Sequence, residues 1–466
     1  MHSHIKATLA GAVSALAIFS FGSSAIAGGH LTAQEQSLIA GAKAEGKVTI
    51  IHPIFSDRTA QRMGEAFKKR YGLGDDFQFN SLRKGTGATV AQVRQEIQAN
   101  KFTVDLILVH SPAFFDQAAE RGAFAELDSG NWKDSTKLVE SAGQYSKYPY
   151  VVTPLAYTFQ PVWNASCPGM ENFSVDSYED AVEASLKGKT ISSDITKSFT
   201  YTNTVIALSK AGAVNFEEFW PALAKTDPIV EFRTEPKMQM LISCQRPFDM
   251  WNLSGRVYQN VIKDPGLADK IKMGSYKEGQ AMLGNQVAVL KGAPHARIAQ
   301  DFVKFCLTRE AQRLWFQKPG TAGGPEDRAL HRAPIRMDMY EPEILAMTTM
   351  PDELPYEDEG NFTYDRELTG KVFNTLRQLV KVMCIDSHEE MKEAWEAIIE
   401  AGMPEDALAV FNDVSKVTYG IAGKGDPGLD SRDTMIQAER MRELGEWFRG
   451  NYRKARDIAK GTQRAN

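Results

Sequence analysis

The sequence predicts an α/β protein with at least two globular units and a helical C-terminal segment. The chain has 466 residues, too many for one hydrophobic core, so two or three domains are expected. From residue 47 to residue 122, β-branched apolar runs alternate with amphipathic stretches, as strands and helices do around a parallel sheet. Beyond residue 340 the apolar residues recur at helical spacing, which predicts helices in about the last quarter of the chain.

The first unit is expected to contain three strands, at residues 47–53, 77–82 and 104–109, each followed by a helix. The third run is almost continuously apolar, which is typical of a strand buried on both faces of a sheet. In open α/β sheets, ligands lie beyond the carboxyl ends of the strands. The polar residues that follow these strands are therefore candidate ligand contacts: Ser56, Asp57, Thr86, Gly87 and Ser111.

A second α/β unit begins at residues 188–210, where a short strand, a hydroxyl-rich loop and a helix start are expected. Free backbone N–H groups at a helix N-terminus, together with Asp194, Ser198 and Thr200, indicate a site for a polar or anionic group. The same side chains could simply cap the helix. Arg233, between a strand and the next helix, could bind an anion through a charge-assisted hydrogen bond or remain a solvated surface residue.

The N-terminus resembles a secretory signal peptide. Lys6 precedes an apolar stretch at residues 7–21, and Ala25-Ile26-Ala27 follows as a cleavage site. A membrane anchor is the alternative, but the apolar run is short for a bilayer. We therefore expect residues 1–27 to be removed on export. No cysteine follows the cleavage site, so a lipid anchor is not indicated.

The four cysteines are Cys167, Cys244, Cys306 and Cys384. None belongs to a C-x-x-C pair, which argues against a zinc or thioredoxin-like site. In an oxidising compartment they could form two disulfides. The pairing Cys167–Cys244 with Cys306–Cys384 would keep each bridge local, and free buried thiols are the alternative.

Composition and motifs exclude several function classes. The net charge is -5 and no basic run of nucleic-acid type is present, which argues against nucleic-acid binding. There is no G-x-S-x-G motif, and His388-Glu389-Glu390 lacks the second histidine of a zinc site. No catalytic residue, metal or cofactor is therefore expected. A secreted hydrolase with a non-standard active site is the alternative function.

Residues 287–295, Val-Ala-Val-Leu-Lys-Gly-Ala-Pro-His, come before residues 299–305 and 308–312, which follow a helical pattern. This order resembles bacterial periplasmic solute-binding proteins of ABC importers, and most of all their ferric-iron-binding-like branch. Residues 42–48 and the segment of Asp105 resemble the same family. The resemblance spans residues 35–340.

The resemblance implies a periplasmic binding protein type 2 fold, with two α/β lobes joined by crossing strands. It implies a periplasmic monomer that captures a small polar, anionic solute by hinge closure and delivers it to an ABC permease and ATPase in the inner membrane. It implies no catalysis. The expected parts are a signal peptide (1–27), the first lobe (31–155), the second lobe (156–272), a return to the first lobe (273–340) and a helical extension (341–466).

The resemblance also bears on the site. Ferric-binding relatives use adjacent tyrosines in the segment that matches residues 248–252, which holds none here, so direct iron binding is not indicated. Other relatives take sugar phosphates, phosphonates, polyamines or thiamine. Trp251 could stack on a ligand or close a lobe edge. Asp57 and Asp249 could pair with a cationic ligand or cap helices, and Tyr157 lies in the first crossing.

The extension contains amphipathic helices, such as the one with Leu368, Val372 and Leu376 on its apolar face. We expect this face to pack on the first lobe. Docking of a partner protein is the alternative.

Overall fold

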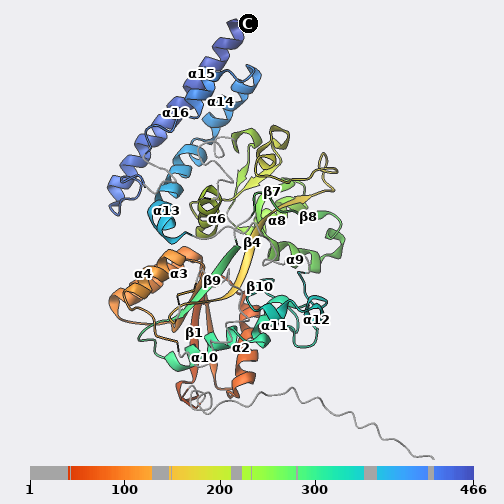
Figure 1. Ribbon diagram of the computed structural model, residues 1–466, viewed down its shortest axis with the longest axis vertical. Helices are drawn as coiled ribbons and strands as arrows, with labels where there is room; N and C mark the ends of the chain where they lie inside the picture. The colour runs from red at the N-terminus through yellow and green to blue at the C-terminus, as the bar shows by residue number, and fades with distance from the viewer. Residues whose placement is uncertain are drawn as a thin grey trace, which may run out of the picture.

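The computed structural model describes residues 40–41, 43–127, 146–147, 149–210, 223–231, 233–279, 282–350, 365–417 and 425–465. The expected signal peptide lies outside these ranges, and so does nearly all of residues 350–356, an acidic segment with two prolines that the sequence predicts to be a linker. Within them, no helix combines the length and apolar character needed to cross a bilayer. Figure 1 shows an elongated molecule with two α/β lobes and a set of C-terminal helices beside one of them.

The first lobe is built on three parallel strands, as the alternating pattern predicted. They are β1 (Lys47–His52), β2 (Gln78–Arg83) and β3 (Leu106–Val109), with β1 between the other two. Strand β9 (Met282–Val289) returns much later in the chain and pairs antiparallel with β3. The helices that follow the three strands are α2 (Asp57–Tyr71), α3 (Thr86–Ala99) and α4 (Pro112–Glu120).

Strand β4 (Val152–Asn164) runs through both lobes (Figure 1). Its first half pairs with β9 and with β10 (Ala333–Pro334). Its second half pairs with β7 (Phe248–Leu253) and β8 (Ile271–Met273). The strand order β2-β1-β3-β9-β4-β7-β5-β6 therefore forms one continuous sheet.

The second lobe contains β5 (Thr190–Ser192) and β6 (Ile229–Val230), parallel to each other, with β5 also parallel to β7. Its helices are α6 (Phe199–Lys210), α8 (Thr234–Ile242) and α9 (Ser254–Lys263). Residues 247–252, which start with a proline and contain two aromatic residues, are predicted from the sequence to form a loop, and this prediction is wrong. The segment is β7, all six residues of which are buried. Its internal Asp249 is tolerated because Lys237 Nζ lies 2.9 Å from Asp249 Oδ1.

The Pro294-His295 turn holds the end of β9 against the start of the sheet. Asp105 is fully buried, and its Oδ2 accepts a hydrogen bond from Thr49 N at 2.7 Å. Asp105 Oδ1 accepts one from His295 N at 2.9 Å. Helix α10 (Ala296–Cys306) starts directly after this turn, and α11 (Arg309–Phe316) follows with Thr308 as its N-cap. The segment at residues 287–295, on which the family resemblance rests, therefore has a structural role.

The C-terminal helices pack on the second lobe, so the expectation that they pack on the first was wrong. They are α13 (Arg366–Val380), α14 (His388–Glu400), α15 (Glu405–Phe411) and α16 (Thr434–Ala465), after the short α12 (Pro342–Leu345). Leu376 and Leu379 share an apolar cluster with Tyr201 and Phe248 of the second lobe. The contact of α13 with the first lobe is polar: Arg366 Nη1 lies 2.7 Å from Asp116 Oδ1 on α4.

One of the two suggested disulfides is present, between Cys167 and Cys244. It joins the segment after β4 to the segment after α8, 77 residues further along the chain. Cys306 and Cys384 are buried free thiols. They lie in separate apolar clusters, Cys306 in the first lobe and Cys384 under the C-terminal helices, so they do not pair.

Candidate ligand-binding cleft

A cavity of about 660 Å³ lies where β4 passes between the lobes. This volume falls within the range of sites for small organic ligands, roughly 300–1,000 Å³. The first lobe contributes the loop after β2 and His110, and the second contributes the loops before α6 and α8. Tyr157 and Phe159 of β4 and Asn285 of β9 complete the lining at the crossing strands.

The first turns of three helices line this cavity. Gly85 is the N-cap of α3 and Arg233 that of α8, and neither makes a side-chain capping bond. At α6, Ser198 Oγ accepts a hydrogen bond from Tyr201 N at 3.2 Å. The N-terminal N–H groups and the helix dipole favour negative charge at such places.

Positive side chains dominate the lining. The basic residues are Arg83, Lys84, Lys197, Arg233, Lys237, Arg256 and Arg332. Among the described lining residues the only carboxylate is that of Glu235, which lies 2.9 Å from Arg256 Nη1. Glu231 binds the Arg233 guanidinium through two of its nitrogens, at 3.2 and 3.0 Å. Within the described chain, no carboxylate lies within ion-pair distance of Arg83.

Lys237 has a structural role beneath the cavity. Its Nζ donates hydrogen bonds to Ser193 Oγ at 2.8 Å and to Trp251 O at 2.7 Å, and it pairs with Asp249. Three donors are all that an ammonium group has. Burial raises the pKa of Asp249, and the Lys237 charge opposes this shift. Lys237 therefore fixes Ser193 in the cavity wall.

His110 is buried at the inner end of the cavity. Its Nδ1 lies 2.6 Å from Gly284 O, so Nδ1 carries the proton and donates. Its Nε2 lies 2.9 Å from Asn203 Nδ2 and therefore accepts. Burial lowers the pKa of His110 to about 4, so the ring is neutral at pH 7.

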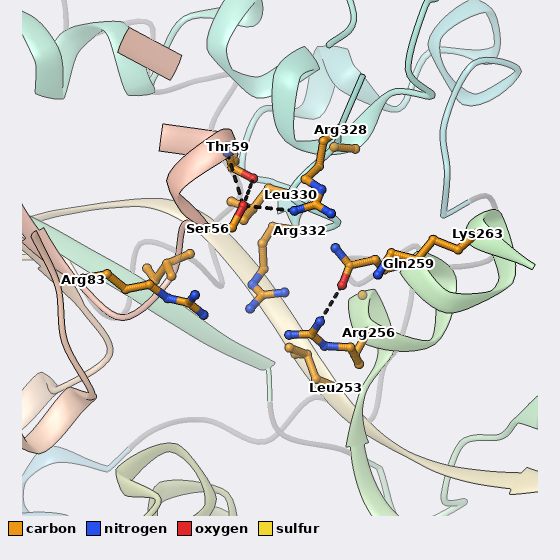
Figure 2. Close-up of a pocket in the computed structure, with 13 residues that line it drawn as sticks. Ser56, Thr59, Arg83, Leu253, Arg256, Gln259, Lys263, Arg328, Leu330 and Arg332 are labelled. Atoms are coloured by element: carbon orange, nitrogen blue, oxygen red, sulfur yellow. Dashed lines mark hydrogen bonds between the residues drawn. The ribbon is translucent and has the colours of Figure 1, made fainter. Parts of the chain in front are cut away.

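A smaller cavity of about 160 Å³ adjoins the first (Figure 2). Arg83, Arg256 and Arg332 line both cavities. The smaller one also holds Arg328, whose Nη1 donates to Ser56 Oγ at 3.3 Å. On its other side Arg256 Nη1 donates to Gln259 Oε1 at 2.5 Å.

The comparison with protein families decides what this two-lobed architecture is. Residues 62–331 match the profile of the bacterial extracellular solute-binding protein family. The chain belongs to this family. A search of curated protein sequences gave no significant match.

The solved structures of similar fold include ABC-transporter proteins and periplasmic binding proteins. An ABC transporter protein from Clostridium perfringens is 16% identical, with 72% of this chain and 98% of that chain covered and a TM-score of 0.52. Iron-bound HitA from Pseudomonas aeruginosa is 16% identical, with 62% and 86% covered and a TM-score of 0.49. AfuA from Actinobacillus pleuropneumoniae, with fructose-6-phosphate bound, is 14% identical, with 63% and 86% covered and a TM-score of 0.49. The α/β two-lobe fold with a helical extension, expected from the sequence, is confirmed.

Six of the twelve candidate ligand residues of this solute-binding protein line a cavity. Ser56 lines the smaller one, and Thr86, Tyr157, Ser198, Thr200 and Arg233 line the larger one. Tyr157 of the crossing strand and Thr200 of the second lobe meet there, with their hydroxyl oxygens 3.4 Å apart. The structure thus brings together candidates from β4 and from both lobes.

The other six do not line either cavity. Asp57 and Gly87 are exposed in the first turns of α2 and α3. Ser111 N donates to Gln286 Oε1 at 3.1 Å, and Asp194 Oδ1 accepts from Thr196 N at 2.9 Å. The remaining two are in the core of the second lobe, where Asp249 pairs with Lys237 and Trp251 packs 5.0 Å from the ring of Tyr201.

The residues that sequence reasoning missed are mostly basic: Arg83, Lys84, Lys197, Arg256, Arg328 and Arg332. Arg83-Lys84 directly follow the second expected strand, which was a usable signal. Arg256 lies in the first turn of α9 after β7, a segment whose sequence predicts a loop. Arg328 and Arg332 lie in an irregular segment after α11, where no periodicity points to a cavity.

The C-terminal helices support one wall of the cleft. Arg377 of α13 donates through Nε to Ile195 O at 3.1 Å and through Nη2 to Thr196 O. Its guanidinium also lies 4.7 Å from the ring centre of Phe199, which lines the cavity. The extension of this family member therefore contacts the loop that leads into α6.

Acidification is expected to destabilise the fold through His110. Above pH 6.5 neither the folded nor the unfolded chain protonates this ring. Between pH 6.5 and about 4 only the unfolded chain takes up the proton, so the free energy of unfolding falls, by about 2 kcal/mol at pH 5. Urea unfolding at pH 7 and pH 5 measures this loss.

The matched variant is His110→Gln, which removes the titrating group and should lose correspondingly less stability on acidification. His52 and His331, whose pKa values burial lowers to about 3, keep their own contributions in both proteins. An equal pH dependence of variant and wild type would show that His110 does not carry this effect.

Proposed function

We propose that this solute-binding protein captures an organic anion in the 660 Å³ cavity and acts as the periplasmic component of an ABC importer. The observation that carries the proposal is the excess of positive charge on the lining. Of its seven basic side chains, four have a carboxylate partner, whereas Arg83 and Lys84 have none within ion-pair distance in the described chain. Arginine guanidinium groups match phosphate, phosphonate and carboxylate oxygens with paired N–H donors. Tyr157, Phe159 and Leu253 offer apolar contact for the body of the solute.

The same lining disfavours the other ligand classes of the family. Polyamines and thiamine are cationic, and they would meet like charge at Arg83, Lys84 and Arg332. Direct iron binding would need several hard oxygen ligands. The described residues contain no group of three or more His, Cys, Asp or Glu side chains placed to hold a metal ion.

We further propose that the lobes close around the anion. The first lobe would bring Arg83 and Thr86 to it, and the second lobe Ser198 and Arg233, with β4 and β9 as the crossing strands. In this proposal the first lobe consists of residues 31–155 and 273–340, and the second lobe consists of residues 156–272. Export by the signal peptide at residues 1–27 and delivery to an inner-membrane permease and ATPase belong to the same proposal.

The test is a thermal-shift screen of the mature protein with monophosphate esters, phosphonates and dicarboxylates, and with spermidine and thiamine as cationic probes. A ligand at 100 times its Kd stabilises by about 2.7 kcal/mol. We expect organic phosphates or phosphonates to raise the melting temperature, less so at high salt because exposed charges are screened, and the cationic probes to leave it unchanged. A shift with the cations alone would contradict the proposal. Chemical consumption of a probe would favour the hydrolase alternative.

A further inference from the structure

The two cavities share a wall of three arginines. Arg83 comes from the end of β2 in the first lobe, Arg256 from the first turn of α9 in the second, and Arg332 from the segment before β10. Figure 2 shows Arg83, Arg256 and Arg332 around one space, with Arg328 above them. A negative group in either cavity would therefore lie close to the same guanidinium groups.

The smaller cavity has basic residues of its own. Arg328 and Lys263 line it and do not line the larger one. The acidic residue next to Arg328 in the chain, Asp327, forms ion pairs with Arg58 and Arg62 of α2 instead. In the described chain, no carboxylate lies within ion-pair distance of Arg328 or Lys263, so no described side chain neutralises their charges.

The neighbouring titratable groups respond to this positive cluster. Burial lowers the pKa of Arg256, which Arg83 and Arg328 lower further against the opposing effect of Glu235. Burial lowers the pKa of His331 to about 3, and the surrounding basic residues, including Arg328 and Lys263, contribute. A bound anion would relieve this mutual repulsion.

The size and donors of the smaller cavity fit one oxyanion group. Its volume of about 160 Å³ is roughly a quarter of the 660 Å³ of the larger cavity, which suits one oxyanion group and not a second organic molecule of the size that the larger cavity holds. Ser56 and Thr59, at the first turn of α2, add hydroxyl groups to the lining. Their own bond, 2.9 Å between the two oxygens, holds them side by side.

We propose that the smaller cavity binds a second oxyanion group of the same solute, so that the natural solute carries two anionic groups, one in each cavity. This inference rests on the proposed function and narrows it from anions in general to doubly anionic molecules. The three shared arginines bridge the two groups. A free inorganic ion in the smaller cavity, independent of the solute, is the competing outcome.

The test uses isothermal titration of the mature protein with alkane-α,ω-bisphosphonates of increasing linker length and with the matching alkyl monophosphonates. We expect at least one bisphosphonate to bind ten-fold or more tightly than its monophosphonate. In Arg328→Gln and Lys263→Gln, each tested separately, bisphosphonate affinity should fall more than monophosphonate affinity, so that this advantage shrinks. Lys263 is exposed, so its variant carries little risk of misfolding.

The outcomes separate the two proposals. Monophosphonate binding without any gain from a second phosphonate would overturn the two-group inference and leave the proposed function standing. Independent binding of inorganic phosphate, unaffected by a bound monophosphonate, would overturn it as well. Absence of binding by every anion would remove both proposals. The matched control is Arg442→Gln, an exposed position on α16 that should behave as wild type.

Discussion

Replacing Arg83 and Arg332 together by glutamine is expected to weaken binding of the anionic solute by roughly 100- to 20,000-fold. A hydrogen bond to a charged group is worth about 1.5–3 kcal/mol, and about 1.4 kcal/mol is a factor of ten in Kd. Both residues line the larger cavity and the smaller one, so both proposed oxyanion positions lose a partner. Titration with the tightest phosphonate or phosphate ester from the screen measures the change.

Glutamine keeps much of the side-chain length and removes the charge, so the comparison isolates electrostatics. Arg332 also lies 5.2 Å from the ring centre of Tyr157, and its single variant will show whether that contact matters for affinity. The dependence of Kd on salt concentration should also become weaker in the double variant, because fewer charged groups contact the anion. Wild-type affinity in the double variant would mean that the anion does not bind between these arginines. Arg442→Gln serves again as the matched control.

The sequence predicted the elements of the fold better than their packing. Strands such as β3 were recognisable because a continuous apolar run needs burial on both faces. Strand β7 was not, because Asp249 and Asn252 interrupt the apolar pattern. Their partners, Lys237 for Asp249 and Met238 Sδ for Asn252 Nδ2, come from a neighbouring helix, and no local rule places them there.

For a related reason, only part of the candidate site could be predicted from the sequence. Hydroxyl groups at helix starts, such as Ser198 and Thr200, carry a local signal because a helix N-terminus is both capped and electropositive. Among the arginines of the cleft, Arg83 carries such a signal at the end of a strand, whereas Arg256 and Arg332 carry none. Arg83, Arg256 and Arg332 come from distant parts of the chain, and only the sheet order, with β4 and β9 at its centre, brings them together. Likewise, α13 packs on the second lobe through its contact with α6, where the ring centres of Phe199 and Phe373 lie 5.1 Å apart.

Removal of the Cys167–Cys244 disulfide in the variant Cys167→Ala/Cys244→Ala is expected to destabilise the second lobe by about 4 kcal/mol. The bridge closes a loop of 77 residues. The chain-entropy model gives about 4 kcal/mol for a loop of this length, because the unfolded chain regains the freedom that the bridge removes. Calorimetric unfolding of the variant and the oxidised wild type under identical conditions measures the difference.

Reduction provides the matched control. A reductant should lower the melting temperature of the wild type towards that of the variant and leave the variant itself unchanged, because Cys306 and Cys384 are free thiols. The bridge holds the segment after α8, from which β7 starts, next to the segment after β4. Arg256 lies in the first turn of α9, which begins directly after β7, so a loosened segment should also weaken anion binding. Equal stability of variant and oxidised wild type would mean that packing around Asn164 and Leu241, where Asn164 Nδ2 donates to Leu241 O at 3.0 Å, already restrains this loop without the bridge.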